Sequence, residues 1–148
     1  MYWKLVKKIG PLSLCLIAAI IGGTYLLSST IYIRSGFTYS SISVMSGLLL
    51  EICFLRVFLK NPGVNFTFTN ASKEVDNEYY CIPCKLVKQP GTVHCLSCDI
   101  CVRGHDHHCP WVGKCIGEGN MMEFQLFLTS FMIFFVCNLI LVMIWKWL

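Results

Sequence analysis

The chain has 148 residues, of which 55% are hydrophobic and only 14% are charged. Its mean hydropathy of +0.62 is too high for a soluble domain of this size and excludes a disordered chain. A net charge of +4 without a dense basic stripe argues against a nucleic-acid-binding scaffold. Because ten cysteines are also present, the composition indicates a membrane protein that carries a cysteine-dense module.

Three apolar segments are long enough to form transmembrane helices, which need about 20 residues. We expect these helices over residues 9–33, 38–59 and 124–145. The first segment follows several lysines, as in a signal peptide, but it is longer than the apolar core of about 7–15 residues that a signal peptide has. We therefore predict an uncleaved span at the N-terminus.

Two kinds of less common side chain fall within the predicted spans. Glu51 interrupts the second span, and a carboxylate inside a membrane is by default a functional candidate. The alternative, which we favour because no motif surrounds Glu51, is a carboxyl group that is protonated or bonded to a neighbouring helix. Cys15, Cys53 and Cys137 are expected to be small, buried apolar residues.

The polar segment between the second and third spans holds many of the basic residues. Its first part, 60–78, is rich in Asn, Thr, Gly and Pro and is predicted to be a cytosolic linker. Lys and Arg gather at the N-terminus and in this polar segment, whereas the first loop offers only Arg34. The positive-inside rule therefore places both regions in the cytosol, on an endomembrane or the plasma membrane.

Residues 79–123 contain seven cysteines and all four histidines. The pattern is Cys81-x2-Cys84-x9-His94-Cys95-x2-Cys98-x2-Cys101, followed by Asp106-His107-His108-Cys109 and Cys115. A reducing cytosol disfavours disulfides, and an odd number of cysteines cannot pair completely. Two Cys-x2-Cys pairs with further His and Cys are typical of tetrahedral metal sites. Scattered core cysteines or a redox pair would not explain the histidines, so metal binding and catalysis are the predicted roles.

With these residues, the segment 81–124 resembles the cysteine-rich domain of the DHHC protein S-acyltransferases (palmitoyltransferases), a family named for the sequence Asp106-His107-His108-Cys109. The similarity continues through Pro110-Trp111-Val112, Cys115, Asn120 and Phe124. It implies an α-helical membrane protein in which a small zinc-stapled domain, 79–123, lies between the second and third of three transmembrane helices.

The resemblance also implies two structural Zn²⁺ ions, each held by three cysteines and one histidine. One ligand set is Cys81, Cys84, His94 and Cys101, and the other is Cys95, Cys98, His108 and Cys115. Each site would be four-coordinate and would leave no open position for water. A segment of about 45 residues cannot bury an adequate core, so the two ions would act as staples.

The remaining residues of the motif suggest a nucleophile and its base. Cys109 lies outside both ligand sets, His107 is the predicted base, and Asp106 would orient the imidazole. The resemblance implies that Cys109 takes a fatty acyl group, with palmitoyl as the expected chain, from acyl-CoA as a thioester and passes it to a protein cysteine. The alternative role for Cys109 is that of a spare zinc ligand. His105 has no role in the motif and is expected to be solvent-exposed.

Substrate contacts follow from the same resemblance. Trp111 and Phe124 would lie against the first part of the fatty chain, in a cavity among the spans; ordinary interfacial packing is the alternative for Phe124. Lys88, which matches a basic position of the family, and Lys85 are candidates for the coenzyme A phosphates, with solvated surface charge as the alternative. The expected partners are acyl-CoA, the lipid bilayer and membrane-associated proteins with cytosolic cysteines, without nucleic acid.

The sequence departs from the family pattern at three places. The family usually has a fourth span with a Thr-Thr-x-Glu motif after it, its Asp-Pro-Gly reads Asn61-Pro62-Gly63 here, and an arginine is replaced around Gln89-Pro90-Gly91. Two function classes therefore stand. An active S-acyltransferase is favoured by the intact catalytic motif, and a catalytically weak or inactive zinc-stapled membrane adaptor by the missing span. The missing span is expected to reflect either a truncated chain or a short family member that recruits an accessory subunit. A zinc ubiquitin-ligase module would need a different ligand spacing.

Overall fold

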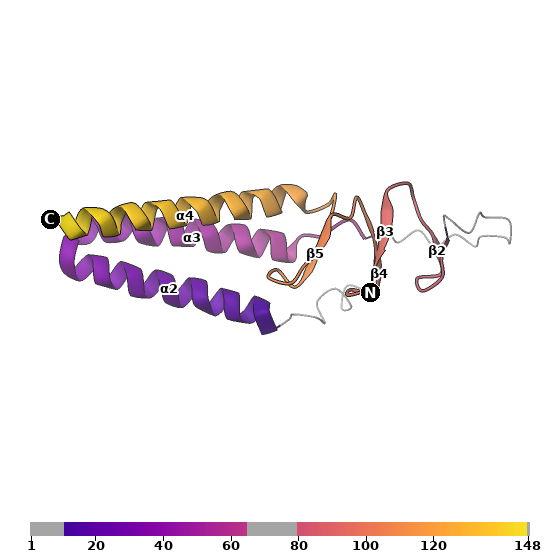
Figure 1. Ribbon diagram of the computed structural model, residues 1–148, viewed down its shortest axis with the longest axis horizontal. Coiled ribbons are helices and arrows are strands. Elements are labelled where there is room, and N and C mark those ends of the chain that lie inside the picture. The colour runs from indigo at the N-terminus through magenta and orange to yellow at the C-terminus, as the bar shows by residue number, and fades with distance from the viewer. Residues whose placement is uncertain (1–10, 65–79, 148) are drawn as a thin grey trace.

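The computed structural model describes residues 11–64 and 80–147, which form helices at one end of the molecule and short hairpins at the other (Figure 1). The helices are α2 (Pro11–Ser35), α3 (Phe37–Leu59) and α4 (Met121–Trp147). Stretches within them, Cys15–Ile33, Phe37–Leu59 and Met121–Ile144, are long and apolar enough to cross a membrane. The three spans and the cysteine-rich segment between α3 and α4 confirm the predicted fold class. Residues 9–10 of the first predicted span lie outside the described residues.

The helices form an antiparallel bundle in which α3 packs against both α2 and α4 (Figure 1). Many large apolar side chains point outward from all three helices, as expected where the solvent is lipid. Polar contacts fix the interior: the buried Ser43 hydroxyl on α3 donates to Asn138 Oδ1 on α4 at 2.6 Å, and Asn138 Nδ2 donates to Phe134 O at 2.8 Å. In a membrane, such bonds help to hold helices in one register.

The side chains singled out in the spans take varied positions. Cys15 is exposed on the outer surface of α2, so the prediction that it is buried is wrong, because the helix presents an apolar face to lipid on that side. Cys53 and Cys137 are only half-buried. Glu51 is half-buried on α3, and its role stays a prediction.

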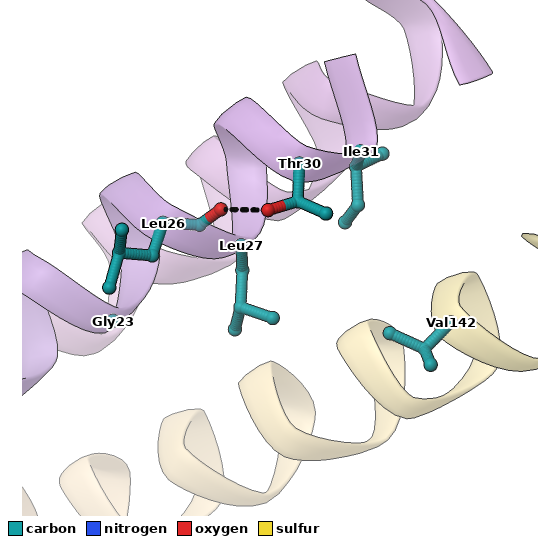
Figure 2. A pocket seen from close by; sticks show the side chains of 6 residues that line it. All are labelled: Gly23, Leu26, Leu27, Thr30, Ile31 and Val142. Carbon is teal, nitrogen blue, oxygen red and sulfur yellow. Dashed lines mark hydrogen bonds between the residues drawn. The ribbon is translucent and has the colours of Figure 1, made fainter. Parts of the chain in front are cut away.

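An apolar cavity of about 310 Å³ lies between α2 and α4 (Figure 2). It is lined by Gly23, Leu26, Leu27, Thr30, Ile31 and Val142. The Thr30 hydroxyl does not add a free polar group, because it donates to Leu26 O at 2.7 Å within the helix. The bundle therefore contains an apolar space at the end away from the cysteine-rich segment.

The cysteine-rich segment consists of three two-stranded antiparallel sheets among the described residues. Their strands are β1 (Tyr80–Cys81) with β2 (Leu86–Val87), β3 (Thr92–Cys95) with β4 (Ile100–Arg103), and β5 (His107–Cys109) with β6 (Lys114–Ile116). A two-stranded hairpin of this length is at best marginally stable alone, so the segment requires cross-links beyond its backbone pairing.

The segment after α3 joins the helices to the hairpins. Asn61 Oδ1 accepts hydrogen bonds from the backbone N–H groups of Gly63 and Val64, both at 2.9 Å, which makes a tight turn. Val64 then forms a β-bridge with Val102 of β4. The chain passes so close to Gly119 that a Cβ there would lie 2.7 Å from the Gly63 nitrogen. Asparagine thus performs the turn at the position where the family usually has aspartate. The predicted linker residues 65–78 lie outside the described residues.

Candidate metal centres and catalytic site

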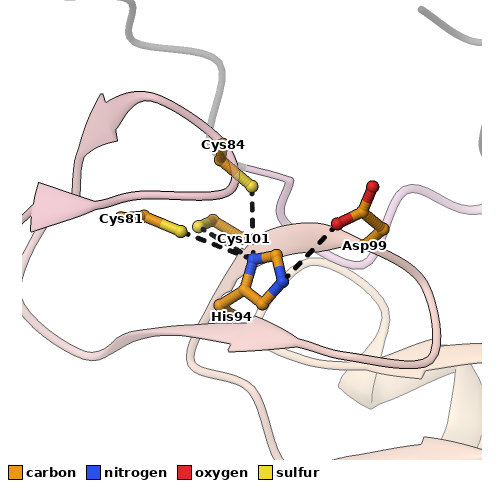
Figure 3. A network of polar contacts seen from close by, with 5 residues as sticks. All are labelled: Cys81, Cys84, His94, Asp99 and Cys101. Carbon is orange, nitrogen blue, oxygen red and sulfur yellow. Dashed lines mark hydrogen bonds and ion pairs between the residues drawn. The ribbon is translucent and has the colours of Figure 1, made fainter.

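The first Cys/His cluster forms around the ring of His94 (Figure 3). His94 on β3 lies directly opposite Cys101 on β4, so both side chains leave the hairpin on the same face. His94 Nδ1 is 3.4 Å from Cys81 Sγ, 3.2 Å from Cys84 Sγ and 3.8 Å from Cys101 Sγ. Figure 3 shows these sulfur atoms pointing at one side of the imidazole.

The second Cys/His cluster has the same arrangement on the next hairpin, β5–β6. His108 on β5 lies directly opposite Cys115 on β6. Its Nδ1 is 3.8 Å from Cys95 Sγ and 3.2 Å from Cys98 Sγ, and the Cys98 and Cys115 sulfurs are 3.4 Å apart. Because successive residues of a strand point to opposite faces, neighbours in the sequence are sent to different clusters. His94 joins the first cluster and Cys95 the second, which explains the interleaved ligand sets.

Each Cys-x2-Cys pair is followed by a residue in a left-handed backbone conformation. Lys85 and Asp99, the residues that follow Cys84 and Cys98, have left-handed φ angles of 52° and 55°. The Lys85 N–H donates to Ile82 O, and the Asp99 N–H donates to Cys95 O. Two non-glycine residues in this uncommon conformation at equivalent positions indicate that both turns are shaped to bring two sulfurs together.

The donor sets of both clusters fit Zn²⁺. The ligand atoms of each cluster all lie within 4.8 Å of one another. Zinc–sulfur bonds of about 2.3 Å and zinc–nitrogen bonds of about 2.0–2.1 Å in a tetrahedron put sulfur and nitrogen about 3.6 Å apart, close to the separations at His94 and His108. Asp99 Oδ1 lies 3.7 Å from His94 Nε2, the position of a carboxylate that orients a metal-binding imidazole.

The pKa values of the cysteine thiols also favour a bound metal ion. Burial raises the pKa of Cys84 and of Cys101. In the second cluster, a hydrogen bond from the Cys115 thiol lowers the pKa of Cys98 to about 5 and raises the pKa of Cys115. Protein groups alone therefore do not keep every thiol of a cluster ionised, whereas a bound dication would offset the repulsion among three thiolates.

Cys109 takes the opposite side of β5 from His108. Its side chain is only 5% exposed and packs in an apolar cluster with residues from all three helices. The buried members of this cluster are Ile20, Leu50, Phe54, Val57, Cys109, Val112, Ile116 and Phe127. The strand thus turns one neighbour toward a metal-binding cluster and the other toward the end of the helical bundle.

His107 shares the face of β5 that carries Cys109. Its Nδ1 is 2.8 Å from Asp106 Oδ2, and its ring meets the Phe124 ring edge to face, with centroids 5.3 Å apart. Because a carboxylate only accepts hydrogen bonds, Nδ1 carries the hydrogen and Nε2 is left to accept a proton. The half-buried Phe124 in the first turn of α4 limits the tilt of the imidazole.

Lys114 is a residue of this region that the sequence analysis did not identify. Its ammonium is buried and donates to Phe58 O at 2.8 Å and to Lys60 O at 2.6 Å. Burial lowers the pKa of Lys114 to about 8, and the negative charges of the Cys98 and Cys115 thiolates oppose this shift. Its place between the turn residue Gly113 and the motif residue Cys115 was the available sequence signal, but its hydrogen-bond partners lie 56 and 54 residues earlier in the sequence.

The remaining predicted site residues are more dispersed. Trp111 is 58% exposed in the turn between β5 and β6. Lys88 is half-buried and Lys85 exposed at the β1–β2 hairpin, which lies farther from the helices than β5 (Figure 1). His105 is half-buried, and its Nε2 is buried without a hydrogen-bond partner among the described residues, so the prediction of a solvent-exposed His105 is wrong.

Comparison with known proteins agrees with this geometry. The model of the DHHC palmitoyltransferase family matches residues 74–148, half of the chain. Palmitoyltransferase ERF2 of Kluyveromyces lactis is 36% identical over 106 residues, covering 55% of this chain and 30% of that protein. Palmitoyltransferases ZDHHC18-B of Danio rerio and ZDHHC9 of Homo sapiens are each 51% identical over 51 residues, covering 34% of this chain and 13% and 14% of those proteins.

The chain therefore spans less than a third of the length of these curated relatives. The family match nevertheless contains both Cys/His clusters and the sequence Asp106-His107-His108-Cys109. With its three span-length helices, the chain is an integral membrane protein. It belongs to the DHHC palmitoyltransferase family.

Proposed function

We propose that this protein is a protein S-acyltransferase that moves a fatty acyl group from acyl-CoA to protein cysteines through a thioester on Cys109. The observation that carries the proposal is the position of Cys109: it lies outside both ligand clusters, next to the His107–Asp106 pair, in an apolar cluster at the end of the helices. A thiol that receives a lipid chain needs an apolar neighbourhood on one side and a proton acceptor on the other.

In the first half-reaction, the Cys109 sulfur attacks the carbonyl carbon of the acyl-CoA thioester. A bond forms between sulfur and the acyl carbon, the bond to the coenzyme A sulfur breaks, and coenzyme A leaves as a thiol with the proton given up by Cys109. In the second, a thiol of the protein substrate gives its proton to His107 Nε2 and attacks the carbonyl carbon of the Cys109 thioester. The bond between that carbon and the Cys109 sulfur breaks, and the Cys109 thiolate leaves and takes the proton back from His107. Asp106 holds the tautomer that allows this transfer and stabilises the imidazolium.

Two structural Zn²⁺ ions are part of this proposal, one in each cluster. When bound, each would cross-link the hairpins and supply folding energy rather than activate water, because three cysteines and one histidine fill its coordination. The hairpins β3–β4 and β5–β6 each contribute a directly opposed His and Cys, so both are tied into the same framework. The nucleophile would thereby be presented by a rigid strand.

The fatty chain would extend from Cys109 into the helical bundle. Ile20 of α2 belongs to the same apolar cluster as Cys109, and Ile31 at the cavity between α2 and α4 lies about 16 Å farther along the helix. Phe124, beside His107, would contact the first carbons of the chain, and Trp111 would complete this contact from the β5–β6 turn. Lys88 would bind coenzyme A phosphate, with the hairpins facing the cytosol.

The direct test uses purified chain in detergent micelles or nanodiscs with an alkyne-tagged palmitoyl-CoA. We expect a covalent label that hydroxylamine removes at neutral pH, as it removes thioesters. Adding a membrane-anchored peptide with a cysteine near the bilayer should transfer the label to the peptide. Absence of any hydroxylamine-sensitive label on chain that retains two zinc ions would contradict the proposed enzyme and favour an inactive zinc-stapled adaptor.

A further inference from the structure

A buried ammonium group connects the β5–β6 hairpin to the end of α3. Lys114 is 8% exposed, and its Nζ donates hydrogen bonds to two backbone oxygens, Phe58 O at 2.8 Å and Lys60 O at 2.6 Å. Burying a charged ammonium is costly unless its donors are paired. The arrangement therefore holds only while the hairpin and the helix end keep their relative position.

The acceptors are well suited to a cation. Phe58 lies in the last turn of α3, where carbonyl groups have no partner within the helix. Lys60 follows as the C-terminal cap, in an extended conformation. The C-terminal end of a helix carries a partial negative charge that favours a neighbouring cation. Lys114 thus donates charge-assisted hydrogen bonds to carbonyl groups at the end of α3. Its positive charge also lies beside the partial negative charge of that helix end.

The strand pairing carries this anchoring to the nucleophile. Lys114 is the register partner of Cys109, so the two residues lie directly opposite each other on the same face of the hairpin. Such residues have Cβ atoms about 4.5–5.5 Å apart. Cys109 packs in the apolar cluster that includes Phe54 and Val57 of α3, the helix whose C-terminal end accepts the hydrogen bonds of Lys114. A hairpin that shifts at Lys114 would therefore shift the Cys109 sulfur against the helix bundle.

We infer that Lys114 is a positioning residue for Cys109: its two hydrogen bonds to the end of α3 set the depth at which the nucleophile sits in the apolar end of the bundle. The inference rests on the proposed acyl transfer for its kinetic consequences. Lys114 does not contact the reacting atoms and acts only through the position of Cys109. Its loss should therefore lower the rate of acylation at saturating acyl-CoA. The KM for acyl-CoA should stay unchanged, because the ammonium is occupied by backbone oxygens.

The test compares Lys114→Met with Lys114→Arg and the wild type, all zinc-loaded and in nanodiscs. Because misplacement of a reacting group by about 1 Å can cost about 100-fold in rate, we expect Lys114→Met to acylate itself about 10- to 100-fold more slowly. Lys114→Arg keeps the charge and several donors and should retain most of the rate. Arg103→Gln, which removes an exposed ion pair with Glu118 in the same segment, is the matched control and should behave as wild type.

A second readout follows the position of Cys109 without any turnover. A charged, water-soluble maleimide should alkylate the Cys109 thiol faster in Lys114→Met than in the wild type, as measured by mass spectrometry of the peptide. Equal acylation and equal alkylation in the two proteins would overturn the inference. So would loss of zinc from both Lys114→Met and Lys114→Gln, which would make Lys114 a residue needed only for folding. If the wild type is not acylated at all, the proposed function fails, and alkylation alone decides the role of Lys114.

Discussion

His108 and Cys115 face each other across the β5–β6 hairpin, and this pairing determines where the neighbouring Cys109 points. Since both belong to one Cys/His cluster, the face of β5 that carries His108 presents donor atoms that could hold a metal ion. The alternation of side chains along a strand then sends Cys109 to the other face, into the apolar cluster of the helices. Motif residues next to each other in sequence can therefore serve structure and chemistry separately.

The first prediction concerns the metal-binding role. His108→Ala should release zinc and unfold the cysteine-rich segment, because a closed metal site contributes folding free energy directly. Elemental analysis gives the zinc content, and limited proteolysis reports the fold of the segment. A variant that kept two zinc ions per chain and the protease resistance of the wild type would show that His108 is not a ligand.

A second prediction separates the base from the residue that orients it. His107→Ala should lower transfer to a cysteine peptide by about 100- to 10,000-fold, the usual contribution of a general base. Asp106→Asn should have a smaller effect, because the imidazole remains but its partner at Nδ1 loses its negative charge. Single-turnover transfer assays measure both rates. Equal rates for His107→Ala and the wild type, with zinc retained, would remove His107 from the mechanism.

The third prediction concerns the junction between the cysteine-rich segment and α4. Asn120 is fully buried; its Oδ1 accepts from the Gly117 N–H at 3.0 Å, and its Nδ2 donates to Cys115 O at 3.1 Å. Asn120→Leu would leave two buried backbone groups unpaired, each costing about 1–3 kcal/mol. Thermal unfolding should therefore shift clearly to lower temperature, whereas Gln125→Leu, at an exposed position of the same helix, should change it little. Similar unfolding temperatures for the two variants would contradict this account.

The parts of the molecule that could be predicted are those governed by local rules. The apolar segments are long enough to predict three helices, and the spacing of cysteines and histidines indicated metal binding. The family resemblance then divided the ligands into the two sets that the structure gathers in two clusters. The interleaving of the clusters follows once His94 and His108 are placed on strands, because Cys95 and Cys109 must then point to the opposite faces. Such features depend on neighbours in the sequence.

Contacts between distant segments could not be predicted in this way. The hydrogen bonds of Lys114 involve carbonyl groups at the end of α3, and nothing in the sequence around Lys114 specifies that partner. The same holds for Ser43 and Asn138, which meet only because α3 and α4 pack side by side. His105 was expected in solvent, yet its Nε2 is buried, and nothing in its neighbours along the sequence indicated this.

A fourth prediction tests the orientation in the membrane. Asn65-Phe66-Thr67 and Asn70-Ala71-Ser72 are two glycosylation sequons between the second span and the cysteine-rich segment. If this side faces the cytosol, both should remain unmodified in cells, and glycosidase treatment should not change the mobility of the chain on a gel. A glycan on either asparagine would place the cysteines in the lumen instead.

The central claim, an acyl-enzyme on a cysteine that binds no metal, is tested most directly by intact mass spectrometry of the wild type and Cys109→Ser after incubation with palmitoyl-CoA. Serine is close to cysteine in size, but its hydroxyl hardly ionises at neutral pH. Position 109 lies outside both ligand clusters, so the substitution should not affect them. The wild type should gain the mass of one palmitoyl group that hydroxylamine removes, and Cys109→Ser should gain none while native mass spectrometry still finds two zinc ions. Loss of zinc from Cys109→Ser, or an unchanged acyl adduct on it, would contradict the account.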